Sequence, residues 1–283
     1  MKLSNSTYIS IILLTALVTF SCKHEFPEMA DGDYDYHILF LHHSTGENIW
    51  SGNTGSFNLF SEEVSVPTIF TDYNETNGTK YHIEERTFPK EEPYGWNNYP
   101  YDYYNIWVKH AGNEAFMEEP TLEMLTKDYD MIIFKHCFPV SSIEEDTGNP
   151  DIDSPEKRLE NYKLQYEALK DKMHEFTETK FIVWTGAALT AYNNTEDRAK
   201  RAREFFNWVK NEWDEQGDNI YLWDFYELET EGGLFLKRDF AVKKNNSHPN
   251  RKFSAKAAKL FAQRILDIIE TNGEKTTLTG NYK

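Results

Sequence analysis

Residues 36–46, with the sequence YHILFLHHSTG, decide the fold that we expect for this chain. The first half of this stretch is a short run of apolar and β-prone residues, which is typical of a strand buried on both faces of a parallel sheet. The run ends abruptly in small and polar residues around Ser44. Because ligands bind beyond the carboxyl ends of the strands in open α/β sheets, Ser44 stands where a nucleophile would lie. The alternative is that this serine only caps the helix or turn that follows.

Strand-like and helix-like segments alternate along the rest of the chain. We expect further strands at 67–73, 81–87, 130–134, 180–185 and 219–224, and helices at 57–64, 154–178, 196–213 and 254–270. Ser154 followed by Pro155 marks the start of the second helix, because serine is a common cap and proline suits the first helical position. The alternation predicts a single three-layer α/β/α domain with a mostly parallel sheet.

A second polar segment, 245–250 with the sequence NNSHPN, lies directly before the last expected helix. A serine hydroxyl is a poor nucleophile until a histidine takes its proton, and a third group usually orients that histidine. Ser44 and His248 are residues of these two types. Ser44 follows the first expected strand and His248 precedes the last expected helix, so both flank the carboxyl side of the expected sheet. We therefore expect Ser44 Oγ and an imidazole nitrogen of His248 to lie within about 4 Å of each other.

This order of residues resembles the SGNH/GDSL hydrolase family, in which an early Gly-Asp-Ser carries the nucleophile and a late Asp-x-x-His carries the other two triad members. The resemblance implies a flavodoxin-like fold and a serine esterase mechanism that needs no cofactor. It places the nucleophile at Ser44 and the base at His248. The orienting residue falls on Asn245, where the family has aspartate, and Asp224 and Asp239 stay open as substitutes.

The family's oxyanion-stabilising blocks are altered in this chain. Histidines replace the Gly-Asp of the first block, Cys137 replaces the asparagine of the third block, and the second-block glycine has only a loose counterpart. Since a thiol is a weak donor, we expect Lys135 or, preferentially, His136 to supply a stronger donor beside the backbone N–H of the nucleophile. The candidate substrate-binding residues are His43, Gly95, Lys135, His136 and Cys137.

The segment 88–108 is unusually rich in tyrosine and tryptophan. Amphipathic rings on a loop make good contact surfaces for sugar rings, so one interpretation is a glycan-binding wall. The other interpretation is a long loop that packs its own rings over the sheet. The sequence leaves both open.

The N-terminal 21 residues resemble a bacterial lipoprotein signal peptide. Lys2 precedes an apolar run at 8–20 that is too short for a comfortable membrane span, and a small residue stands directly before Cys22. We expect a lipid anchor at Cys22 in the bacterial cell envelope, a tether at 22–35, the catalytic domain at 36–272 and a tail at 273–283. The alternative is ordinary secretion with Cys22 as a plain residue.

The composition narrows the possible partners. The formal net charge of −17 argues against nucleic acid, which requires basic patches. The chain has two cysteines, so acylation of Cys22 would leave Cys137 unpaired and the fold without a disulfide framework.

Three functions agree with these patterns. The first is a serine esterase, for which the family resemblance suggests acetylated polysaccharide or another ester as the substrate. The second is a catalytically weak or inactive glycan-binding surface lipoprotein of the same fold, favoured by the missing aspartate. The third is a zinc site, although adjacent histidines on a strand point to opposite faces. Its possible ligands are His42, His43, His136, Cys137 and His248.

Overall fold

The computed structural model of this chain describes residues 32–54, 64–95 and 97–283. The expected signal peptide, Cys22, most of the expected helix at 57–64, and Trp96 lie outside the described residues. Among the helices that are described, none combines the length and the apolar composition needed to cross a bilayer.

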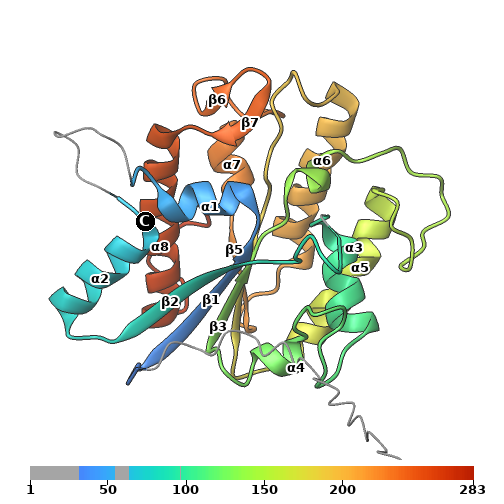
Figure 1. The fold of residues 1–283 in the computed structure, drawn as a ribbon. Coiled ribbons are helices and arrows are strands. Elements are labelled where there is room, and N and C mark those ends of the chain that lie inside the picture. The colour runs from blue at the N-terminus through green and yellow to red at the C-terminus, as the bar shows by residue number, and fades with distance from the viewer. Residues whose placement is uncertain (1–31, 55–63, 96) are drawn as a thin grey trace, which may run out of the picture. The chain divides into compact units, whose positions relative to one another are not determined.

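A five-stranded parallel sheet forms the centre of the fold (Figure 1). Its strands are β1 (Tyr36–His42), β2 (Tyr81–Thr87), β3 (Met131–Phe134), β4 (Lys180–Trp184) and β5 (Ile220–Trp223). They lie in the order β2-β1-β3-β4-β5, and each neighbouring pair is parallel. This is the flavodoxin-like strand order, so the expected α/β fold class is confirmed.

Helices cover both faces of the sheet, with α1, α2 and α8 on one side and α3, α5 and α6 on the other (Figure 1). The helices are α1 (Ser44–Ser51), α2 (Val66–Asn77), α3 (Pro100–Tyr104), α4 (Leu122–Leu125), α5 (Leu159–His174), α6 (Glu196–Trp208), α7 (Phe225–Thr230) and α8 (Arg251–Thr271). Short π-helical turns extend α3 to Lys109 and α6 to Trp213. A 3-10 helix spans Phe138–Ser141, and β6 (Ala241–Lys243) and β7 (Asn246–Pro249) form an antiparallel hairpin.

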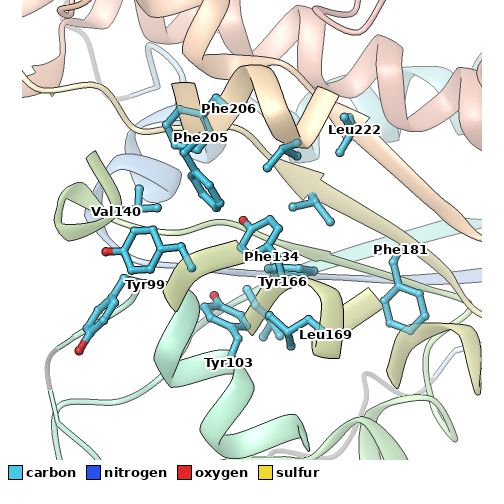
Figure 2. Packing of buried hydrophobic residues seen from close by; sticks show 14 of the residues in the cluster. Tyr99, Tyr103, Phe134, Val140, Tyr166, Leu169, Phe181, Phe205, Phe206 and Leu222 are labelled. Atoms are coloured by element: carbon cyan, nitrogen blue, oxygen red, sulfur yellow. The ribbon is translucent and has the colours of Figure 1, made fainter. Parts of the chain in front are cut away.

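Successive strand residues enter two different cores, because side chains alternate across a strand. Ile132 and Phe134 of β3 pack into the core under α3, α5 and α6, whereas Ile133 packs into the core under α8. Figure 2 shows Phe134, Tyr103 and Tyr166 in the first of these cores, where the rings of Phe134 and Tyr103 have centroids 4.9 Å apart. This alternation decides which residues beyond the end of β3 can reach each side of the sheet.

Two expected elements differ from the structure. Residues 67–73 lie within helix α2, whose start is set by Ser65, since its hydroxyl accepts a hydrogen bond from Thr68 N. The expected helix at 154–178 begins only at Leu159. Ser154 Oγ accepts a bond from Glu156 N instead, at 3.2 Å, and so holds a local turn.

The aromatic segment after β2 is mainly helical and packs inward. Tyr99, Tyr103 and Trp107 are buried in the core, where the rings of Tyr103 and Trp107 pack on Phe134 with centroids 4.9 and 5.2 Å apart. The self-packing interpretation is therefore confirmed for these rings, although the segment is not a loop. They are not available to stack on a ligand.

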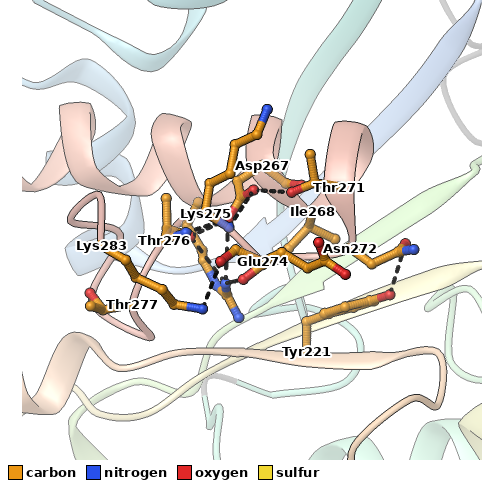
Figure 3. A network of polar contacts seen from close by, with 12 residues as sticks. Tyr221, Asp267, Ile268, Thr271, Asn272, Glu274, Lys275, Thr276, Thr277 and Lys283 are labelled. Carbon is orange, nitrogen blue, oxygen red and sulfur yellow. Dashed lines mark hydrogen bonds and ion pairs between the residues drawn. The ribbon is translucent and has the colours of Figure 1, made fainter.

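The segment after α8 is fixed to the body of the domain. Asp267 accepts hydrogen bonds from the backbone and hydroxyl of Thr276 at 2.7 and 2.6 Å (Figure 3). Further along, the Thr279 carbonyl accepts a bond from Trp223 Nε1 at 3.2 Å. These contacts tie residues 276–279 to α8 and to the end of β5.

Candidate active site

Ser44 stands at the junction of β1 and α1. The strand ends at His42, His43 is the N-terminal cap residue, and Ser44 is the first residue of the helix. The turn is tight: a Cβ at position 46 would lie only 2.4 Å from His42 Cβ and Cγ, so Gly46 is required there. This strand-turn-helix junction presents Ser44 at the carboxyl edge of the sheet.

His248 reaches Ser44 from the β6–β7 hairpin, 204 residues later in the chain. His248 Nε2 lies 2.9 Å from Ser44 Oγ, so the expected distance below about 4 Å is confirmed. Phe138 holds the imidazole from the side, in an edge-to-face contact with ring centroids 5.1 Å apart. The two side chains are placed as a nucleophile and its general base would be.

Asn246, and not Asn245, orients the imidazole. Asn246 Oδ1 accepts from the backbone N–H of His248 at 3.0 Å and lies 2.8 Å from His248 Nδ1. A backbone N–H can only donate, so the Asn246 atom that faces it is the carbonyl oxygen. His248 Nδ1 therefore carries the proton, and Nε2 is left unprotonated to accept from the Ser44 hydroxyl. The assignment of Asn245 to this role is wrong; its exposed side chain belongs to a neighbouring depression.

The spacing of three residues that the family resemblance implies does not fit the extended chain of β7. In β7, residues two apart share a face, which places Asn246 beside His248. Ser247 points the other way and is buried. Its hydroxyl oxygen accepts from Thr190 N at 3.0 Å and from Asn193 Nδ2 at 2.9 Å. Ser247 thus ties the hairpin to the loop after β4 and fixes the position of His248.

Neither alternative aspartate takes part. Asp224 accepts from Thr185 Oγ1 at 2.6 Å and pairs with Lys210 at 2.7 Å. Asp239 meets the end of the hairpin through its backbone carbonyl, which accepts from Asn250. His248 therefore has a neutral amide as its partner, and its pKa is lowered from the usual 6.5, first by burial and then by the positive charge of Lys135. At neutral pH the imidazole is an unprotonated base.

His136 lies on the wrong side of the sheet to act on a substrate. Its fully buried ring packs edge-to-face on Tyr103, with centroids 4.8 Å apart, and neither ring nitrogen has a partner among the described residues. Burial, and then the charge of Lys135, holds the pKa of His136 well below its usual value. The expectation that His136 supplies the oxyanion donor is therefore wrong.

Lys135 continues the alternation of β3 toward the face that carries α1 and α8. Its side chain is fully buried, and Nζ donates to the His136 carbonyl at 3.0 Å. Glu229 of α7 is equally buried; burial raises its pKa to about 8, and the charge of Lys135 opposes this rise. Burial in turn lowers the pKa of Lys135. Lys135 lies close enough to the Ser44–His248 pair for its charge to lower the pKa of His248.

The two histidines before Ser44 have structural partners. His42 Nε2 lies 2.6 Å from Glu85 Oε2, and His43 Nε2 donates to the Pro89 carbonyl at 2.6 Å. Burial lowers the pKa of His43 to about 4, which keeps its ring neutral. In the part of the chain that the structure describes, no group of three or more His, Cys, Asp or Glu side chains could hold a metal ion. The zinc alternative therefore finds no ligand cluster in these ranges.

The backbone N–H groups of the candidate site residues differ in availability. Gly95 N donates to the Lys90 carbonyl at 3.3 Å, and Cys137 N donates to Asn98 Oδ1 at 2.8 Å, so both are engaged. The Ser44 N–H has no acceptor among the described residues, as is usual for the first turn of a helix. It lies at the positive end of the α1 dipole, which favours an anion.

Asn98 holds two loops near Ser44, a role that the sequence did not indicate. It is fully buried, and its amide nitrogen donates to the Phe88 carbonyl at 2.5 Å while its oxygen accepts from Cys137 N. It therefore joins the loop after β2 to the loop after β3, the two loops that flank Ser44 in the sheet order. From the sequence, this linking role could be recognised only if the burial of Asn98 within a polar loop were known.

An open depression of about 450 Å³ adjoins His248. Phe138 and Leu189 form its apolar part, and Asn193, Asn245 and Lys243 supply polar groups. Amide side chains both donate and accept hydrogen bonds, so this lining presents donors and acceptors beside His248.

No protein-family model and no curated protein compared with this sequence matches it. Similar solved structures include a protein from Parabacteroides merdae described as a GDSL-like lipase, 14% identical over 82% of this chain and 97% of that chain, with a TM-score of 0.41. An acetyl-xylooligosaccharide esterase from Geobacillus Stearmophilus is 11% identical over 81% and 94%, with a TM-score of 0.44. A carbohydrate esterase family 2 enzyme from Corynascus thermopiles is 13% identical over 85% and 69%, with a TM-score of 0.45.

Proposed function

We propose that this protein is a serine esterase in which Ser44 is the nucleophile, His248 the general base and Asn246 the residue that fixes the histidine tautomer. The observation that carries the proposal is the chain of contacts from Ser44 Oγ to His248 Nε2 at 2.9 Å and from His248 Nδ1 to Asn246 Oδ1 at 2.8 Å. Each atom in this chain has the donor or acceptor character that proton transfer from serine requires.

The reaction begins when Ser44 Oγ attacks the ester carbonyl and passes its proton to His248 Nε2. The tetrahedral intermediate carries a negative oxygen, which the Ser44 N–H at the α1 N-terminus stabilises. His248 then protonates the leaving alcohol, and the acyl group stays on Ser44. A water molecule, activated by the same histidine, releases the acid and restores the serine.

In its charged form, buried Lys135 has two opposite effects on this cycle. Lys135 disfavours the imidazolium form of His248, and it does so without a carboxylate on the other side of the ring to compensate. The same charge favours the negative oxygen of the intermediate, for which the chain lacks the usual asparagine donor. Lys135 therefore takes over part of the oxyanion stabilisation through its charge.

We further propose that the ester is an acetyl group on a polysaccharide. The amide-lined depression supports this substrate class, because it offers hydrogen-bond partners for sugar hydroxyls next to His248. For the anchor, the lipobox-like sequence before Cys22 supports attachment to a bacterial membrane through that thiol.

Release of p-nitrophenol from its acetate ester tests the catalytic proposal. We expect steady turnover that falls to background in Ser44→Ala and in His248→Ala. Ser142→Ala, on the loop after the 3-10 helix, is the matched control and should leave turnover unchanged. Turnover that persists in Ser44→Ala would overturn the proposal.

The absence of a carboxylate on His248 favours one alternative, a glycan-binding protein of the same fold that has lost catalysis. That function predicts no Ser44-dependent turnover on any ester, together with measurable binding of a glycan. The same pair of variants therefore separates the two functions.

A further inference from the structure

Positive charge gathers on one segment of an otherwise acidic protein. The chain has a formal net charge of −17, yet residues 237–252 contain a single acidic side chain, Asp239. The basic side chains of this segment are Lys237, Arg238, Lys243, Lys244, Arg251 and Lys252. This segment includes the β6–β7 hairpin, which carries His248.

Two of these cations, one at the depression beside His248 and the other next to it in the sequence, have no carboxylate partner among the described residues. Lys243 lines the depression, and both Lys243 and Lys244 are exposed. Neither lysine forms an ion pair within the described residues. In contrast, Lys237 of the same segment is paired with Glu231. These two exposed lysines are therefore available to an anionic ligand.

An exposed aromatic ring lies beside these lysines. Tyr192 is 67% exposed, and Lys244 Nζ lies 5.8 Å from the centroid of its ring. The loop that carries Tyr192 is fixed to the hairpin through the bond between Asn193 and Ser247. A tyrosine held in this way presents a flat apolar face with a polar edge, which suits the face of a sugar ring.

We propose that the hairpin and the Tyr192 loop bind an acidic glycan, so that the esterase acts on polysaccharides that contain uronic acid residues. Tyr192 stacks on a sugar ring, Lys243 and Lys244 bind carboxylates of the chain, and Asn193 and Asn245 bind hydroxyls. The position of the ester over Ser44 rests on the proposed function, whereas the binding of the acidic glycan does not require catalysis.

Because the protein as a whole is acidic, the exposed lysines of this segment decide where an acidic glycan binds. A polyanion is repelled by most of an acidic surface, so it associates where unpaired cations concentrate. Attraction to exposed lysines is screened by salt, with a Debye length of about 10 Å at 0.1 M ionic strength. Binding of an acidic oligosaccharide should therefore weaken as salt is added, and binding of a neutral one should not.

Calorimetric titration of Ser44→Ala protein tests the proposal without turnover. The probes are oligomers of galacturonate and of mannuronate, with neutral xylo-oligosaccharides of the same length for comparison. We expect tighter binding of at least one acidic series at low salt. Adding Lys243→Gln and Lys244→Gln should weaken that binding about two- to thirtyfold, on the scale of two exposed ion pairs. Lys259→Gln, which removes an exposed charge from α8, is the matched control and should have no effect.

Tyr192→Ala separates stacking from charge. It should weaken binding of acidic and neutral oligomers alike, by about two- to tenfold, because every sugar ring loses the same contact. Equal affinity for acidic and neutral probes, or acidic binding that is unaffected by salt and by the two lysine substitutions, would overturn the proposal. Such a result would not affect the proposed function, which turnover of p-nitrophenyl acetate tests separately.

Discussion

Replacing Asn246 by aspartate should strengthen the catalytic relay. The substitution keeps the shape of the side chain and places a carboxylate oxygen where Oδ1 now lies, 2.8 Å from His248 Nδ1. The backbone N–H of His248 still donates to it, as it does to Oδ1 at 3.0 Å. The histidine tautomer therefore stays the same, and the change adds only a negative charge beside the ring.

The magnitude follows from Coulomb attraction to the imidazolium that forms during the reaction. Two unit charges about 4 Å apart attract by about 4 kcal/mol at an effective dielectric constant of about 20. The site is partly open to water, which weakens this attraction, so we expect about 1.4 to 2.7 kcal/mol in the transition state. Since 1.36 kcal/mol corresponds to a factor of ten, kcat should rise about ten- to a hundredfold.

The pH profile of ester hydrolysis gives a second readout of the same change. Only unprotonated His248 can accept the Ser44 proton, so activity is lost as pH falls through its pKa. In the native protein burial and Lys135 lower this pKa, and the acidic limb should lie below the ordinary imidazole value of about 6.5. Asn246→Asp raises the pKa and should move the limb to higher pH.

Asn245→Asp is the matched control, because it adds the same charge one residue away without touching Nδ1. We expect it to leave the acidic limb near its native position. A faster enzyme with a shifted limb in Asn245→Asp, together with no change in Asn246→Asp, would refute the assignment of Asn246. A lower kcat at every pH in Asn246→Asp would refute the argument from charge.

Three further predictions concern the rest of the site and the anchor. Lys135→Met should lower kcat about tenfold or more, since it removes a charge that favours the oxyanion. It should also move the acidic limb of the pH–rate profile to higher pH, because the charge that lowers the pKa of His248 is lost. An unchanged profile would contradict the role of Lys135. His136→Ala should cost about 2 to 4 kcal/mol of unfolding free energy in a denaturant titration, as for other buried rings, while the folded variant keeps Ser44-dependent turnover; a large loss of kcat in stably folded protein would return His136 to the site. Cys22→Ser should abolish acylation. If the variant protein stayed in the detergent phase of a partition assay, the lipid anchor at Cys22 would be contradicted.

Much of the fold could be predicted because the strands are short apolar runs that end in polar residues. The run at 36–46 correctly placed β1 and the start of the site. The strand expected at 67–73 is wrong. Its β-branched and aromatic residues favour a strand locally, but the cap at Ser65 and the packing of Phe70 against the α8 face support a helix. Tertiary packing overrode local preference there.

The site was predicted as far as residue types and chain order allow. Ser44 was found because it follows a buried parallel strand at its carboxyl end, and His248 because a histidine stands before the last helix, in the order of the family that the chain resembles. Asn246 and His136 were misjudged for one physical reason: adjacent residues of an extended chain face opposite sides. The sequence does not show which side of the sheet holds the nucleophile, so Lys135 and His136 could not be told apart until the two cores were known.

Covalent labelling with a fluorophosphonate, followed by mass spectrometry of the digested protein, tests the central claim most directly. Such reagents phosphonylate a serine, with loss of fluoride, only when a base activates its hydroxyl. We predict one adduct, on the peptide that contains Ser44, formed rapidly in the native protein and at background rate in His248→Ala. An adduct on a different serine with Ser44 unmodified, or equal labelling with and without His248, would contradict the claim that these two residues form the catalytic pair.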